Sequence, residues 1–240
     1  MSEFAAQMLA GKIHAKSRVR ASRLAHAVDG VRRMVEVAPN SYVSISFGKQ
    51  SICMAHMVYR IAPETPMFFL ASDETWDMHN FREVIDDFLT KWPIRLKIVQ
   101  TNRLYGAASW KAGRDAGDKD LQRMCPREEW DGWYMGLASD ESRARKITLL
   151  KHCSAHRTIY RYRDGKYRCC PLMDWTLDDI AAYVWEHDLP LLDIYRKVGL
   201  HMRTTARLTK KAVELGGGWA RVADSRGRRR IKNIHQEIDI

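Results

Sequence analysis

The sequence predicts an α/β fold, a doubly wound parallel sheet of the Rossmann-like type, on three observations. Runs rich in β-branched and aromatic residues occur at Tyr42–Phe47, Met67–Ala71 and Ile94–Val99. Helical patterns separate these runs, at Ile52–Ile61 and Met78–Leu89. The second run is continuously apolar, as expected for a strand that is covered on both faces. Strand, helix, strand, helix, strand is the order in which such a sheet is built.

The rest of the chain adds helices and one strand to this plan. Ser17–Glu36 is predicted as a helix before the first strand, Trp133–Leu137 as a fourth strand, and Asp140–Leu150 as the helix after it. The clearest helix follows Thr176, because Thr176 and Asp179 have the spacing of a capping pair and an apolar stripe continues to Glu186.

Positive charge is concentrated at the two ends of the chain, whose formal net charge is +11. Lys12–Arg33 holds seven Lys/Arg against one acid and Arg196–Lys232 twelve against two, whereas Met34–Tyr195 has 21 basic and 23 acidic residues. Such ends can bind nucleic acid by releasing counterions, line a pocket for one nucleotide, or simply be solvated. We therefore expect a basic N-terminal helical segment (1–38), an α/β domain (39–200, with an insertion at about 101–131) and a basic C-terminal extension (201–240).

The composition argues against a membrane or secreted protein. The chain is 45% hydrophobic and has eight Trp and nine Tyr, so it can bury a substantial core. No apolar stretch is long enough to cross a bilayer, and the first residues lack the apolar core of a signal peptide. Five cysteines, an odd number, do not form a disulfide framework. We expect a cytoplasmic protein.

The turn at Ser46–Ser51 (Ser-Phe-Gly-Lys-Gln-Ser) is a candidate phosphate site. A strand runs into it and a helix leaves it, so unpaired backbone amides and the helix dipole favour an anion there. The serine hydroxyls can donate to phosphate oxygens, Gly48 permits close approach, and Lys49 supplies a positive charge. We expect Lys49 and Ser51 to be exposed at this loop. The alternative is an ordinary Ser/Gly turn, since the spacing is not that of a Walker motif.

This turn resembles the Ser-Gly-Gly-x-Asp-Ser signature of the PP-loop ATP pyrophosphatases, and the chain is most similar to their phosphoadenosine phosphosulfate (PAPS) reductase branch. The resemblance covers roughly Ser41–Leu200 and implies the adenine nucleotide alpha hydrolase-like form of the sheet. Further elements of the branch occur in order. They are Ser72–Thr75 for Asp-Thr-Gly, Gly136–Arg145 for Gly-[Ile/Leu]-Arg-x-x-Glu-Ser-x-x-Arg, Pro171–Thr176 for Pro-Leu-x-Asp-Trp-Thr, and Leu189-Pro190 with Tyr195 for Leu-Pro-x-x-x-x-Tyr.

Three positions depart from the family pattern. Phe47 replaces a loop glycine, Gln50 replaces an aspartate, and Ala138 replaces the arginine after Gly-Leu. Phe47 should stiffen the loop, and Gln50 removes a carboxylate that would help to organise magnesium.

The resemblance implies an enzyme that binds ATP with Mg²⁺ and cleaves it between the α and β phosphates, releasing AMP and pyrophosphate. Relatives of this type support sulfur transfer, including DNA phosphorothioation, so a nucleic acid and other proteins of such a pathway are implied partners. The implied catalytic residues are Lys49, Ser51, Asp73 and Arg145. The implied nucleotide-binding residues are Ser44, Ser46, Phe47, Gly48, Lys49, Gln50, Ser51, Asp73, Gly136, Glu141 and Arg143, with Asp73 a partner for Mg²⁺ or the ribose.

Two other functions remain open. A PAPS or adenylyl sulfate (APS) reductase attacks sulfur with a cysteine thiolate near its C-terminus. Here the last cysteine is Cys170, and neither the reductases' Glu-Cys-Gly-Leu-His tail nor a late Cys-x-x-Cys pair is present in the sequence. This makes the reductase the less favoured enzyme. The other alternative is a nucleic-acid-binding protein that keeps the fold without catalysis, which Phe47 and Gln50 would suit.

Several candidate residues also have a purely structural interpretation. Glu141 and Arg145 are four apart and can form a helix-surface ion pair. Asp174 can help to start a helix, and Trp175 and Tyr195 can be core residues.

A cysteine-bound metal is a further alternative. Cys125, Cys153, Cys169 and Cys170 could bind an iron–sulfur cluster, and Cys125, Cys153 and Cys169 with His156 could bind zinc. The spacing is unconventional for either, and buried thiols are the commoner outcome. We predict no metal ligands, and we expect Cys53 to lie in the core.

Overall fold

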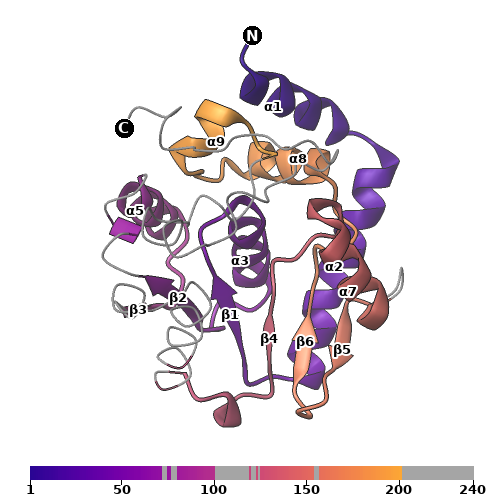
Figure 1. The fold of residues 1–240 in the computed structure, drawn as a ribbon, viewed down its shortest axis with the longest axis vertical. Helices are drawn as coiled ribbons and strands as arrows, with labels where there is room; N and C mark the ends of the chain where they lie inside the picture. The colour runs from indigo at the N-terminus through magenta and orange to yellow at the C-terminus, as the bar shows by residue number, and fades with distance from the viewer. Residues whose placement is uncertain are drawn as a thin grey trace.

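The computed structural model of the chain describes residues 1–71, 75–76, 80–100, 119, 123, 125–153 and 157–201. Within them, six strands form one sheet in the order β3-β2-β1-β4-β6-β5 (Figure 1). Neighbouring strands are parallel except for β5 and β6, so the predicted doubly wound sheet is confirmed. The strands are β1 (Ser41–Ile45), β2 (Met67–Ala71), β3 (Leu96–Gln100), β4 (Gly132–Tyr134), β5 (Ile159–Arg161) and β6 (Tyr167–Cys169).

Helices cover both faces of this sheet. They are α1 (Glu3–His14), α2 (Arg18–Val37), α3 (Lys49–Ile61), α5 (Phe81–Lys91), α7 (Arg143–His152), α8 (Leu177–His187) and α9 (Asp193–Val198), with 3₁₀ turns η1 (Arg127–Glu129) and η2 (Ser139–Glu141). The predicted helices are present with small shifts of their ends. The helix expected from Asp140 is divided at Ser142, whose side chain caps α7. Helices α1 and α9 and the short, charged β5–β6 hairpin were not predicted, because none shows a marked apolar period.

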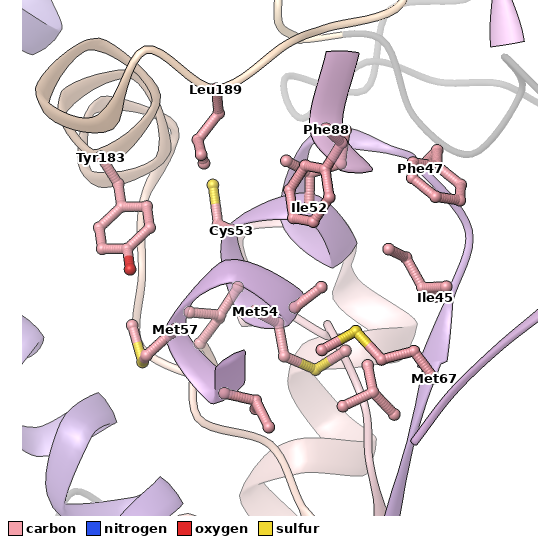
Figure 2. Packing of buried hydrophobic residues seen from close by; sticks show 14 of the residues in the cluster. Ile45, Phe47, Ile52, Cys53, Met54, Met57, Met67, Phe88, Tyr183 and Leu189 are labelled. Atoms are coloured by element: carbon pink, nitrogen blue, oxygen red, sulfur yellow. The ribbon is translucent and has the colours of Figure 1, made fainter. Parts of the chain in front are cut away.

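The largest apolar cluster lies between the sheet and α2, α3, α5 and α8, with α3 at its centre. Every residue of α3 from Lys49 to Val58 is buried. Figure 2 shows Cys53 and Met57 of this helix facing Leu189 and Tyr183. Cys53 is therefore a core residue, as predicted, and burial raises the pKa of its thiol.

Part of the N-terminal positive charge is used inside the fold. Helix α1 packs across α8 (Figure 1), where a side chain at Gly11 would collide with the backbone of Ala181. Asp179, in the first turn of α8, forms the predicted capping box with Thr176 and accepts hydrogen bonds from His14 and Arg23. Burial alone would raise the pKa of Asp179, but these hydrogen bonds lower it.

The opposite face of the sheet has two smaller apolar clusters. Tyr42 packs against Phe68, Trp130 and Trp133 with ring centroids 5.4–5.7 Å apart. The second cluster joins α7 to β5 through residues that include Leu149 and Tyr160. This places α7 beside the upper ends of β5 and β6 (Figure 1). In the described part of the chain, no helix has the length and apolarity needed to span a bilayer.

The histidine pair between α3 and α8 predicts a loss of stability in mild acid. Burial, with His187 and Arg60 nearby, lowers the pKa of His56 to about 3, and burial with Arg60 and Arg20 lowers that of His187 to about 4. The unfolded chain binds these protons near pH 6.5, so stability is complete above that pH and falls as the pH drops towards the folded values. For His56, which is 2% exposed, we expect a loss of about 2 kcal/mol at pH 5.

Thermal unfolding at pH 7 and pH 5 measures this effect. The His56→Gln variant should show a smaller difference between the two pH values than the wild type. An equal difference in both proteins would show that His56 is not responsible.

Candidate functional site

The turn between β1 and α3 has an unusual backbone at Phe47. Its φ is 51°, in the left-handed region, which costs a non-glycine residue roughly 1–2 kcal/mol. The ring is fully buried against Phe69 and Phe88, 5.1 and 6.2 Å away between centroids (Figure 2). Burying a phenylalanine stabilises by about 1.5–3 kcal/mol, which offsets the strain. The ring of Phe47 belongs to the core, so a contact of this residue with a nucleotide would involve its backbone.

The two serines of the turn bond to the loop itself. Ser51 Oγ accepts a hydrogen bond from the Ser46 amide at 3.1 Å and donates to the Gly48 carbonyl at 3.0 Å. Ser46 Oγ lies 3.0 Å from Ser51 Oγ. Ser51 thus ties the two ends of the loop together, and its hydrogen is used there. The prediction that Lys49 and Ser51 are exposed is wrong, because they are only 2% and 6% exposed, enclosed by the elements that pack on the loop.

Helix α3 begins without a side-chain cap. Gly48 is its N-cap residue, with φ −75°, whereas α2, α7 and α8 are each capped by a serine or threonine side chain. The Lys49 amide donates to the hydroxyl of Tyr195 in α9 at 3.3 Å. Burial raises the pKa of Tyr195 to about 12, so the phenol stays neutral and can both accept from the loop and donate.

A cavity of about 190 Å³ opens at the start of α3. Eight of the predicted site residues line it together, from β1, the loop, the end of β4 and the start of α7. They are Ser44, Ser46, Gly48, Gln50, Ser51, Gly136, Glu141 and Arg145. Sequence reasoning left Met135, Leu137 and Tyr195 out of the site, and the remaining wall is made of them. The Leu-Pro-x-x-x-x-Tyr element was the available signal for Tyr195.

Gly136 fixes the distance between two walls of this cavity. A β-carbon at Gly136 would lie 3.0 Å from Ser51 Cα and 3.1 Å from the Ser51 amide nitrogen. These approaches are closer than ordinary carbon contacts, so a side chain would push the β4 segment away from the loop. Gly136 is thus required by packing, and it also lines the cavity, where its role in nucleotide binding stays a prediction.

Glu141 and Arg145 form an ion pair and also lie in the candidate site, so both interpretations of the sequence apply to them. They form the i, i+4 ion pair, yet their side chains are only 7% and 28% exposed and both line the cavity. The Ser142 side chain accepts a hydrogen bond from the Arg145 amide at 3.2 Å, which fixes the first turn of α7. Arg143, which directly follows Ser142, is exposed. It lines neither this cavity nor the smaller one beside it.

A smaller cavity, of about 40 Å³, adjoins the first one. Gln50 and Glu141 line both, and Lys49 lines only the smaller. The Lys49 ammonium lies 5.4 Å from the centre of the Tyr195 ring. Lys49 and Arg145 thus line different cavities, which share Gln50 and Glu141.

The described residues do not fit a resident metal. No group of three or more His, Cys, Asp or Glu side chains among them could hold a metal ion. Cys125 packs with Tyr42, whereas Cys153 and Cys170 lie in the cluster beneath α7. A hydrogen bond with Cys170 lowers the pKa of Cys153 and, together with burial, raises that of Cys170.

The larger cavity offers magnesium few protein ligands. Mg²⁺ prefers carboxylate and phosphate oxygens. Among the described residues that line the larger cavity, the one carboxylate is Glu141, which is paired with Arg145. Asp73, the other predicted partner, and His156 lie outside the described residues.

Asp174 and Trp175 have the structural roles that the sequence allowed. Trp175 is fully buried. Asp174 lies 3.1 Å from His26 of α2, between side-chain Oδ2 and Nδ1.

The left-handed backbone at Phe47 predicts that a glycine variant is more stable than an alanine variant, which is the reverse of the usual order. Phe47→Ala should destabilise the fold by about 3–5 kcal/mol, because it leaves a cavity in the core. Phe47→Gly removes the same ring but relieves the left-handed strain, so we expect it to be the more stable of the two by about 1 kcal/mol. Urea unfolding of both variants measures the difference, and an alanine variant at least as stable as the glycine variant would contradict the strained turn.

Comparison with known proteins identifies a family for this arrangement. The family model described as the phosphoadenosine phosphosulfate reductase domain matches residues 40–205. The chain is 27% identical over 164 residues to an adenosine 5'-phosphosulfate reductase of Halalkalibacterium halodurans, with 63% of this chain and 67% of that protein covered. It is also 27% identical to a phosphoadenosine 5'-phosphosulfate reductase of Xylella fastidiosa strain M12, covering 62% and 64%. The chain thus spans about two thirds of the length of these relatives.

Solved structures show the same fold at lower identity. A phosphoadenylyl-sulfate reductase from Candida auris superposes with a TM-score of 0.52 at 16% identity, over 71% of this chain and 84% of that one. An NMN synthetase from Francisella tularensis superposes with a TM-score of 0.52 at 13% identity, over 80% and 77%. Because the family match covers the strands, the loop and the cavity walls described above, the chain belongs to the phosphoadenosine phosphosulfate reductase domain family.

Proposed function

We propose that the chain is a sulfur-transfer-type enzyme that binds an adenine nucleotide with its phosphates against the turn Gly48–Ser51. The observation that carries this proposal is the uncapped start of α3, which opens into a cavity that Arg145 also lines. Backbone amides and the dipole of a 13-residue helix favour an anion at that point. Family membership supports a nucleotide substrate of this kind.

The reaction that we propose is cleavage of ATP between its α and β phosphates, in which an oxygen of water or of an acceptor forms a bond to the α-phosphorus as the bond to pyrophosphate breaks. The loop would retain the leaving pyrophosphate, and Arg145 would stabilise the negative charge that develops during the displacement. Glu141 is a positioning residue in this scheme, because its ion pair holds the guanidinium of Arg145. The buried Lys49 would add positive potential from beneath the loop. No step is assigned to magnesium, since the described side chains do not form a site for it.

Reduction of an adenylyl sulfate is the second candidate, and the names of the relatives favour it. That reaction needs a thiolate that reaches the sulfur of the substrate. All five cysteines are buried, and none of them lines either cavity in the part of the chain that the structure describes. The geometry of these residues therefore supports ATP cleavage better.

Incubation of the protein with α-labelled ATP and Mg²⁺, and separately with labelled PAPS or APS and a dithiol, tests both reactions. AMP and pyrophosphate are the expected products, and the Arg145→Gln variant should form them about 100-fold more slowly. Arg32→Gln, an exposed arginine on α2, is the control and should match the wild type. Release of sulfite would establish the second candidate instead, and ADP with phosphate would contradict ATP cleavage between the α and β phosphates.

Gly48→Ala tests the phosphate position without disturbing the fold. Its new β-carbon would meet Tyr195 Oη at 3.4 Å and Ser46 Oγ at 3.6 Å, which are ordinary contacts, and its φ suits alanine. The methyl group would stand beside two residues of the cavity wall, so nucleotide affinity should fall about tenfold, or about 1.4 kcal/mol. Calorimetric titration with ATP and a thermal melt measure affinity and stability. Unchanged affinity in a folded variant would place the phosphates elsewhere.

A further inference from the structure

A second concentration of positive charge lies outside the two ends of the chain. Between Arg143 and Arg168 there are nine Lys/Arg and one acidic residue, Asp164. The central segment as a whole has nearly equal numbers of basic and acidic residues, because its acids lie mostly outside this stretch. In the fold, these residues form α7 and the β5–β6 hairpin.

The helix and the hairpin make one continuous surface. The His152 ring, at the end of α7, stacks on Tyr160 at 4.8 Å and meets Tyr162 edge-on at 5.8 Å. Leu149 and Cys153 of the same region share an apolar cluster with Tyr160. Figure 1 shows α7 at the upper ends of these two strands. One apolar cluster therefore holds the two elements together. Arg161 is set apart, because side chains alternate along β5 and it lies over Tyr167 on the opposite face of the strand.

Most of these cations face solvent. Arg168 is ion-paired with Asp164, and Arg145 with Glu141, so two of the nine are used locally. Apart from Arg161, the exposed ones are Arg143, Lys146, Lys151, Arg157 and Arg163, which together with Tyr162 define the α7–hairpin surface. Exposed apolar side chains lie among them, with Ile147 59%, Leu150 60% and Tyr162 44% exposed.

We propose that the α7–hairpin surface binds single-stranded nucleic acid. Five exposed cations suit a partner with regularly repeated negative charges, because each phosphate contact releases counterions. The exposed ring of Tyr162, with the Arg168 guanidinium 5.4 Å from its centre, offers a stacking platform that an unpaired base can use and a duplex cannot.

The surface begins where the candidate site ends. Arg143 is the first residue of α7, and Arg145, two residues later, lines the larger cavity. A strand bound along α7 would thus bring a backbone or base group to the cavity mouth, which makes nucleic acid the acceptor class for the reaction. This last step rests on the proposed function, whereas binding of the strand does not.

Fluorescence anisotropy with a short labelled single-stranded DNA measures the binding. The triple variant Lys146→Gln, Lys151→Gln, Arg163→Gln removes three exposed cations of the surface. We expect it to bind at least tenfold more weakly, with the slope of log K against log salt reduced by about 2. The matched control Lys12→Gln, Lys16→Gln, Arg32→Gln removes the same charge from exposed positions of the N-terminal helical segment and should stay within about twofold of the wild type. RNA of the same sequence, titrated in parallel, distinguishes the two kinds of strand, and the same loss with either supports the inference.

Tyr162→Ala separates stacking from charge. It should weaken single-strand binding about tenfold and leave duplex binding almost unchanged. Equal losses in the two triple variants, tighter binding to duplex DNA, or preferential binding to anionic lipid vesicles would each overturn the inference. Nucleotide turnover by the wild type without DNA is a separate measurement. If turnover is absent while strand binding follows these expectations, the proposed function fails and the binding surface stands.

Discussion

At Phe47 the chain adopts a left-handed backbone conformation and turns an aromatic ring into the core against Phe69 and Phe88. The family signature has glycine at this position, and the backbone angle explains why: only glycine adopts it without strain. Here the strain is offset by burial of the ring. The same inward turn keeps the ring out of the cavity, so the start of α3 stays open even though a bulky residue stands in the loop. If the ring pointed outwards, the loop would lose its contacts with the core, and the ring would block the start of α3.

Contacts within the loop and from distant parts of the sequence hold the loop in place beside the cavity. Ser51 ties the loop to itself, Tyr195 accepts the Lys49 amide, and Gly136 permits the β4 segment to approach Ser51. Each contact fixes the amides at the start of α3 more firmly. An anion site built from backbone groups gains from such rigidity, because the amides need no reorganisation when charge arrives.

Much of the fold could be predicted because local patterns and tertiary packing agree in it. The apolar runs become β1, β2 and β3, and the Thr176–Asp179 pair caps α8. The features that the sequence did not predict depend on contacts between elements that are distant in the sequence. The direction of the Phe47 ring depends on the core beyond it, and the burial of Lys49 depends on α9. The short hairpin β5–β6 has too few residues to show a period, and counting charges by segment concealed the basic surface that it forms with α7.

A crystal structure with the non-cleavable analogue α,β-methylene-ATP tests the central claim most directly. We expect its terminal phosphates within hydrogen-bonding distance of the backbone amides of Gly48–Ser51, with the guanidinium of Arg145 on the side of the α-phosphate. Phosphates bound elsewhere in the molecule, or a nucleotide whose base rather than its phosphates occupies the start of α3, would contradict it.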